Sequence, residues 1–314
     1  MVDVLTVLAV VSSFFMSVSI GASSVSPAFG PVNSSGYMNV LRSALLAGFF
    51  AFLGSVVQGG NVSKTVGSGF LTGEIVILQA AIILIVAAGL VIFSVLTDYP
   101  MPTAFTVVGA VLGSSFAFGN SIVMPVLNKV VLYWVLVPFA AAAMSYVVAK
   151  LLQMYISKEN SKKEIKYLLI ITGSYMAFTA GAGSVGLAIG PLMSILDVST
   201  LILLIFGGVS ILIGSWIYSP RIIRAVSYDY SNIGPRRSIA ALGTSAILAQ
   251  IGIFYGVPIS FNEAIIASII GSGLVEGKSN TGSRKILRTV LAWIGAFFLA
   301  GGITYVIAEI ALLI

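Results

Sequence analysis

Two short stretches rich in glycine and serine are the parts of this chain best suited to bind a ligand. They read GASSVSPAFGP from Gly21 to Pro31 and GAGSVGLAIGP from Gly181 to Pro191, with seven of eleven positions identical. Each follows an apolar run, and helix breaks in a membrane leave backbone N–H groups that line a cavity and attract anions. The competing interpretation is close helix packing through small residues. The pattern predicts a substrate site formed by Ser23, Ser24, Val25, Ser26, Gly183, Ser184 and Val185.

A second pair of motifs reads PMPTAF from Pro100 to Phe105 and PISFNE from Pro258 to Glu263. Each opens a short apolar segment, and polar groups at such a break suit the coordination of a substrate or an ion. Glu263 enters an apolar run, and a carboxylate within a membrane is a functional candidate, here for the coupling ion. The alternative is that Glu263 lies in water at the membrane surface. The motifs also add three residues to the predicted substrate site: Thr103, Ser260 and Asn262.

Composition restricts the functions open to these residues. Of 314 residues, 58% are hydrophobic and 8% charged, whereas soluble domains carry about 25% charged residues, so we expect a polytopic membrane protein. The sequence has no Cys and no His, which excludes cysteine nucleophiles, Ser-His-Asp triads and histidine-ligated metals. We therefore expect no catalytic residue, no metal site, no organic cofactor and no enzymatic activity. The basic residues cluster between apolar runs, which indicates cytoplasmic loops rather than a nucleic-acid site.

Ten apolar runs are candidates for membrane segments, since a spanning helix needs about 20 residues. The fourth and ninth are short and begin beside a proline, so they are either full spans or half-spanning hairpins. We expect the first run to be retained, because Asp3 stands where a signal peptide is positively charged. The ten runs are Val2–Ile20, Asn39–Val57, Ile75–Leu96, Pro102–Phe118, Val130–Leu152, Tyr167–Ala182, Leu201–Tyr218, Ser238–Tyr255, Ile259–Leu274 and Ile286–Ile314.

Loop charges predict the orientation of these segments. If the N-terminus lies outside the cell membrane, fourteen of the 16 basic residues fall on the cytoplasmic side, and only Lys64 and Lys129 lie outside. Both termini then face outward. Residues 157–166 form a cytoplasmic linker between a first half, 1–156, and a second half, 167–314. Because each half holds five segments, the second is inverted relative to the first.

The predicted fold is thus an all-α polytopic membrane protein with two inverted-topology repeats and interrupted helices or hairpins. This pattern is typical of secondary transporters, whose site lies where the repeats meet.

At these motifs, over nearly its whole length, the chain resembles the inorganic phosphate transporter (PiT) family. Each half of that family carries a motif like Gly-Ala-Asn-Asp-Val-Ala-Asn-Ala, whose Asn-Asp pairs coordinate phosphate and sodium. The matching residues here are Ser23-Ser24 and Gly183-Ser184, so both Asn and both Asp are absent. The second motif pair also departs from the family's Pro-x-Ser-Thr-Thr-His pattern. The resemblance implies a transporter in contact with membrane lipid and is compatible with a homodimer.

The missing carboxylates bear on the substrate. Phosphate near neutral pH carries a P–OH proton that a buried carboxylate accepts, whereas sulfate has no such proton and leaves that acceptor unpaired, at about 1–3 kcal/mol. Serine hydroxyls at both positions favour a fully deprotonated oxyanion, and the Gly-Ala-Ser motif resembles the sulfate permease branch of the family. We therefore interpret the chain as a cation-coupled sulfate symporter. Phosphate symport is the first alternative and a passive anion channel the second.

The coupling cation is either Na+ or H+. A dianion entering a negative cell needs such coupling, because each charge costs about 2.3 kcal/mol per 100 mV. Backbone carbonyls and hydroxyls can hold Na+ even without the two Asp. A chain without His needs a carboxylate to carry H+. Glu263 is the first candidate, followed by Glu74, Asp98, Glu276 and Glu309.

Overall fold

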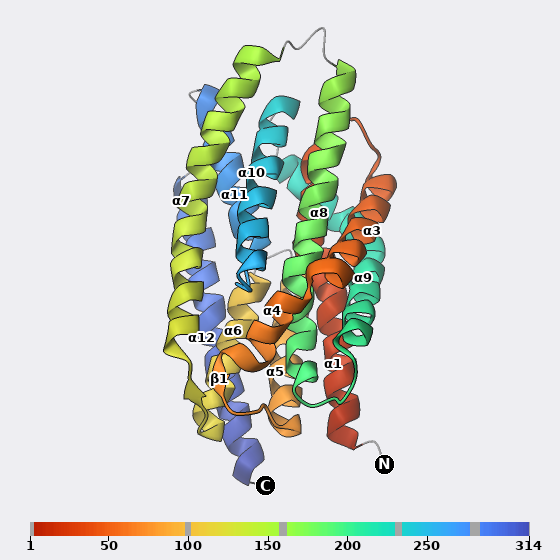
Figure 1. Ribbon diagram of the computed structural model, residues 1–314. Helices are drawn as coiled ribbons and strands as arrows, with labels where there is room; N and C mark the ends of the chain where they lie inside the picture. Colours follow the sequence, from red (N-terminus) through yellow and green to blue (C-terminus); the bar gives the residue numbers. More distant parts are fainter. Residues whose placement is uncertain (1–2, 98–101, 157–161, 230–233, 277–282, 314) are drawn as a thin grey trace.

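The computed structural model describes residues 3–97, 102–156, 162–229, 234–276 and 283–313, which form an elongated bundle of helices with both termini at one end (Figure 1). The first half contains α1 (Val4–Ile20), the π turn η1 (Gly21–Val25), the 3-10 turn η2 (Ser26–Phe29), α2 (Gly30–Ser34), α3 (Val40–Gln58), α4 (Gly60–Lys64), the π turn η3 (Thr65–Gly69), β1 (Leu71–Thr72), α5 (Ile77–Thr97), α6 (Thr103–Phe118), β2 (Ser121–Ile122) and α7 (Met124–Tyr155). The second half contains α8 (Lys162–Met193), α9 (Thr200–Asp229), α10 (Pro235–Phe254), α11 (Phe261–Gly273), the 3-10 turn η4 (Leu274–Glu276) and α12 (Ser283–Leu313). The predicted all-α membrane fold is confirmed.

The two halves repeat one series of elements. Each has two long helical runs, then a hairpin of a longer and a shorter helix, then another long helix. The hairpin is α5–α6 in the first half and α10–α11 in the second. In Figure 1 the α5–α6 hairpin lies toward the end that carries the termini, and α10–α11 toward the other end. The hairpins thus enter the bundle from opposite faces, as inverted repeats require.

The fourth and ninth apolar runs form the short arms of these hairpins. Eight helical runs within the described residues are long and apolar enough to cross a membrane. Helix α6 has 16 residues and α11 has 13, below the about 20 that a span needs. Strand β1 pairs antiparallel with β2, so the chain enters and leaves the α5–α6 hairpin at one face. These lengths favour the half-spanning alternative for both runs.

The two copies of the glycine-serine motif differ in backbone conformation. In the first copy, α1 passes into η1 and η2 before α2 resumes at Gly30. Helix α8 runs through the second copy unbroken, so the expectation of an interruption in both halves is wrong. The reason is Pro27, which has no N–H to donate to a helix. Leu187 stands at the equivalent place, and α8 meets Pro191 only in its last turn.

Helices of one half pack against helices of the other. Helix α12 lies along α6, α11 along α7, α3 along α8 and α1 along α9. A Cβ atom at Gly113 would overlap the carbonyl of Gly301, and one at Gly271 would overlap the carbonyl of Ala142. Such close backbones require residues without side chains at the contact. The two halves therefore share one core.

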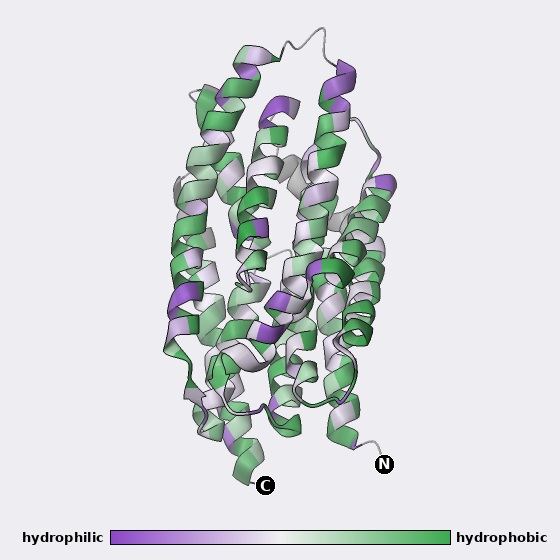
Figure 2. Cartoon of the chain, viewed as in Figure 1, coloured by the Kyte–Doolittle hydropathy of each residue, from purple (hydrophilic) through white to green (hydrophobic). Residues whose placement is uncertain are grey.

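The outside of the bundle is apolar along its length and hydrophilic at one end. Figure 2 shows green faces along α7 and α12, and large exposed side chains on them include Phe139 and Phe298. Hydrophilic residues gather at the upper ends of α8 and α10, away from the termini (Figure 2). These ends begin at Lys162 and Pro235, and the latter is followed by Arg236 and Arg237. Such a surface suits lipid along the sides and water at the charged end.

Candidate functional site

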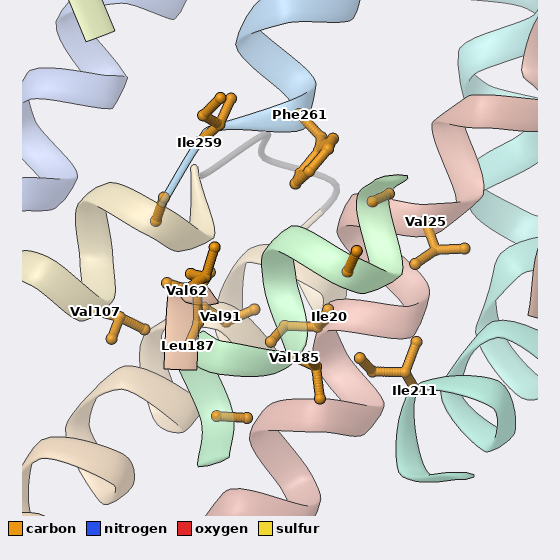
Figure 3. Packing of buried hydrophobic residues seen from close by; sticks show 14 of the residues in the cluster. Ile20, Val25, Val62, Val91, Val107, Val185, Leu187, Ile211, Ile259 and Phe261 are labelled. Atoms are coloured by element: carbon orange, nitrogen blue, oxygen red, sulfur yellow. The ribbon is translucent and has the colours of Figure 1, made fainter. Parts of the chain in front are cut away.

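Four segments meet where the two glycine-serine motifs cross. The turns η1 and η2 pack against α8, α6 also contacts α8, and α11 contacts η2. Figure 3 shows labelled side chains from three of these segments around the crossing, namely Val25, Val185 and Phe261. The first residues of both short helices thus lie beside the repeated motifs, Thr103 at Ser24 and Phe261 at Gly183. The structure brings all four sequence motifs to one place.

A pair of buried hydroxyls forms the contribution of the first half. The Oγ atom of Ser24 and the Oγ1 atom of Thr103 share a hydrogen bond of 3.1 Å. Both residues are buried, and Thr103 is the first residue of α6, after Pro102 in an extended conformation. Each oxygen keeps lone pairs, and one of the two keeps a free proton. This pair can exchange its mutual hydrogen bond for bonds to an anion.

The other two serines of the first motif donate hydrogen bonds to backbone carbonyls. Ser23 Oγ donates to the carbonyl of Ser19 at 2.8 Å, and Ser26 Oγ donates to the carbonyl of Gly21 at 3.1 Å. The second bond reaches five residues back, as the wide π turn permits. In this conformation their hydroxyl protons are committed to the interrupted helix.

The second half contributes an unpartnered hydroxyl. Ser184 Oγ is fully buried in α8 and has no hydrogen-bond partner among the residues that the structure describes. Its counterpart Ser24 has Thr103, but the residue equivalent to Thr103 is Phe261, whose ring cannot bond to a hydroxyl in that way. The ring lies on Gly183 instead, 2.6 Å from where a Cβ atom would be. Among the described residues at this crossing, Ser184 therefore has a hydroxyl group that is free to bond to a ligand.

Helix α11 begins with the second set of polar residues. Ser260 caps it, accepting a hydrogen bond of 3.3 Å from the backbone N–H of Glu263. Asn262 lies half-buried in the first turn. The Glu263 side chain is only 4% exposed, and no described residue forms an ion pair or hydrogen bond with its carboxylate. An ionised carboxylate in such a place needs a cation or a proton, and its burial argues against the water-exposed alternative.

The two valines of the predicted site can offer a ligand only backbone atoms, because their side chains are apolar and buried. Val25 and Val185 are fully buried in the apolar core. Val185 packs against the position of Gly59 and against Gly207. Phe261, by contrast, was absent from the predicted site. An aromatic residue in an apolar chain carries no signal by itself, and only its equivalence to Thr103 marks it.

A sequence profile of the phosphate transporter family matches this chain twice, over residues 20–166 and 156–304. The chain belongs to the phosphate transporter family. Its two matches cover the two halves in turn, as expected for a repeat. The family and the fold are those of transporters rather than enzymes.

The proteins that this chain resembles are named for different substrates. Sulfate permease CysP of Bacillus subtilis (strain 168) is 31% identical, over 97% of this chain and 87% of its own length. A putative phosphate permease of Methanocaldococcus jannaschii is 25% identical, over 91% of both chains. A solved structure of a sodium-dependent phosphate transporter has a TM-score of 0.89, covers 99% of this chain and all of its own, and is 19% identical. At this low identity, the similarity between the two structures shows the fold alone.

Proposed function

We propose that this protein is a secondary active transporter that imports sulfate together with a cation. The observation that carries the proposal is the chemistry of the crossing: Ser24 and Ser184 stand where the resembled motif has carboxylates. Hydroxyls donate hydrogen bonds to an oxyanion without adding negative charge. The positive ends of α6 and α11 add to this preference. The relative named sulfate permease, which spans almost the whole chain, supports the same substrate.

Phosphate is the second candidate substrate. Other relatives are named phosphate permeases, and a hydroxyl also accepts a hydrogen bond, so it can bind a P–OH group. The pair Ser24 and Thr103 is able to do both. Serines in place of carboxylates therefore no longer disfavour sulfate, and they still allow phosphate to bind. A passive anion channel remains the third possibility, distinguished by uptake that needs no cation gradient.

For the coupling cation, we propose that Glu263 carries H+ or binds Na+. Its buried carboxylate has no described partner, so either cation would compensate it. Relatives named as sodium-dependent phosphate transporters favour Na+. The missing Asp residues favour H+, since fewer hard oxygen ligands remain for a metal ion.

We also propose that the protein lies in the cell membrane with both termini outside. Helices α8 and α10 begin at the end opposite the termini, and their first turns contain Lys162, Arg236 and Arg237. Arg42 lies in the first turn of α3 at the same end. Basic residues on one face mark it as cytoplasmic.

Uptake of radiolabelled sulfate into proteoliposomes tests the substrate, with phosphate as competitor and with Na+ and H+ gradients imposed separately. Saturable, gradient-dependent uptake that phosphate barely inhibits is expected. Ser24→Ala and Ser184→Ala should each lower uptake at least about tenfold, because a hydrogen bond to a charged group is lost. Ser43→Ala is the matched control, since Ser43 is also buried and unpartnered but lies at the far end of α3. Uptake of phosphate with no uptake of sulfate would overturn the proposal.

A further inference from the structure

The tip of the α10–α11 hairpin is held by side chains of the first half. Lys129 Nζ donates to the carbonyl of Tyr255 at 2.7 Å, and Asn61 Nδ2 donates to that of Phe254 at 3.3 Å. Just above the tip, Gln250 Nε2 donates to Gln58 Oε1 at 2.7 Å. We call these four side chains, Gln58, Asn61, Lys129 and Gln250, the tip latch. Every one of its bonds joins one half of the molecule to the other.

The latch satisfies groups that a helix end leaves free. The carbonyls of residues 251–253 accept from the backbone N–H groups that follow α10, which leaves those of Phe254 and Tyr255 to the side chains of the latch. A cation is also favoured at the negative end of a helix. Lys129 supplies that cation, and its ammonium also lies 5.5 Å from the centre of the Tyr255 ring. Gly256, with φ of 69°, then turns the chain toward α11. The C-terminal end of α10 is thus capped by side chains from the other half of the same chain.

Three side chains of the latch also line a cavity next to the candidate site. A cavity of about 250 Å3 is lined by Gln58, Asn61 and Gln250, together with Ile253 and Phe254. Ile253 lies with its Cγ1 atom 3.2 Å from the Cβ position of Gly183. One side chain therefore separates the cavity from the crossing. Phe254 is 72% exposed, so the tip is open to its surroundings on the other side.

The sequence places these side chains at one hairpin only. In the other half, the positions equivalent to Gln58, Asn61 and Gln250 hold Tyr218, Arg221 and Ile92. The amide pair and the amide cap therefore have no counterpart in sequence at the α5–α6 hairpin. A transporter built from inverted repeats closes its two faces in turn, with different contacts at each face. Side chains that occur at one hairpin only therefore indicate a role in closing one face.

We propose that the tip latch is the gate between the oxyanion site and the face that carries the termini. The inference rests on the proposed transport function and adds the residues that must separate for substrate to enter. Opening breaks the bonds of Asn61, Lys129 and Gln250, and the α10–α11 tip moves away from α3, α4 and α7. The released ammonium of Lys129 then stands at the open mouth, where its charge attracts an anion.

Cysteine chemistry tests the gate directly, because the chain has no Cys of its own. The double variant Gln58→Cys/Gln250→Cys, bridged by a bifunctional methanethiosulfonate reagent, should lose oxyanion uptake and regain it on reduction. The pair Thr72→Cys/Ser121→Cys is the control, since these are facing residues of β1 and β2 within the first half. It should transport equally with and without the bridge. Undiminished uptake by bridged Gln58→Cys/Gln250→Cys protein would overturn the proposal.

A second measurement needs no substrate, so it stays decisive if the double variant is inactive or the proposed substrate is wrong. The variant Ile253→Cys places a thiol on the cavity wall, and its rate of alkylation by a membrane-impermeant maleimide reports opening. Adding Lys129→Met should speed alkylation about tenfold, since it removes a hydrogen bond with a charged donor. Adding Lys64→Met, which removes the same charge outside the latch, should leave the rate unchanged. Equal rates with and without Lys129→Met would show that the latch does not gate the cavity.

Discussion

Hydroxyl groups supply the side-chain hydrogen bonds at the centre of this transporter. Ser24 and Thr103 bond to each other, while Ser184 has no partner among the described residues. A buried polar atom without a hydrogen bond costs about 1–3 kcal/mol. An oxyanion that accepts from Ser184 gains this free energy when it binds. Specificity then depends on what the ligand leaves unpaired, and a fully deprotonated anion leaves little.

At the same scale, Glu263→Gln should separate coupling from binding. The neutral amide cannot carry a proton or balance a cation, so accumulation of sulfate against a gradient should fall at least about tenfold. Exchange of internal for external sulfate needs no net cation movement and should continue. Both are measured in the same proteoliposomes. Glu309→Gln is the control, because Glu309 is half-buried in α12 and already hydrogen-bonded to Tyr305. Normal accumulation by Glu263→Gln would refute this role.

Sequence reasoning reached the polar residues of the site because they stand out in a chain that is 58% hydrophobic. Ser24, Ser184 and Thr103 were all predicted, and the structure brings the segments that carry them together. Phe261 could not be found in this way, since its significance is its position opposite Gly183 in the fold. Lys129 was expected on the outer side, with no partner predicted for it. It caps a helix end of the other half, a contact between residues far apart in sequence that local patterns do not encode.

At the scale of elements, proline placement separates the two copies of one motif. Pro27 interrupts the first copy with η1 and η2, whereas α8 continues through the second. Two related sequences thus give a helical run with π and 3-10 turns and a regular α-helix, which meet at the candidate site. The near identity of the motifs predicted two breaks, because it hid the single substitution that decides backbone hydrogen bonding. The short hairpin arms were predicted better, since their length and their preceding prolines are local signals.

Helix contacts between the halves yield a stability prediction. Gly271→Ala places a methyl group against the backbone of α7 at Ala142, which cannot yield as a flexible side chain would. We expect a loss of about 1–3 kcal/mol in the free energy of unfolding, the usual effect of overpacking. Gly89→Ala is the control, because nothing lies within 4 Å of its added Cβ atom in α5. Its gain in helix propensity should keep it neutral or slightly stabilising. Thermal unfolding in detergent compares the two, and equal midpoints would contradict the close approach of α11 to α7.

At the scale of the whole molecule, inversion makes the two faces alike in architecture, and side chains make them differ. Both faces receive a hairpin whose short helix points at the crossing. The amide pair and the amide cap of the tip latch occur in sequence at one hairpin only. An importer benefits from this inequality, since the two faces open onto different concentrations of substrate. Which face lies outside therefore determines whether the tip latch would control entry or release of the anion.

Single cysteines in an otherwise cysteine-free chain decide that orientation. Asp3→Cys lies at the face of the termini, and Ser34→Cys lies at the exposed last residue of α2, toward the other face. If basic residues mark the cytoplasmic side, an impermeant maleimide should label Asp3→Cys in intact cells. Ser34→Cys should react only after the cells are permeabilised. The reverse pattern would place the tip latch on the cytoplasmic side, where it would control release of the oxyanion rather than its entry.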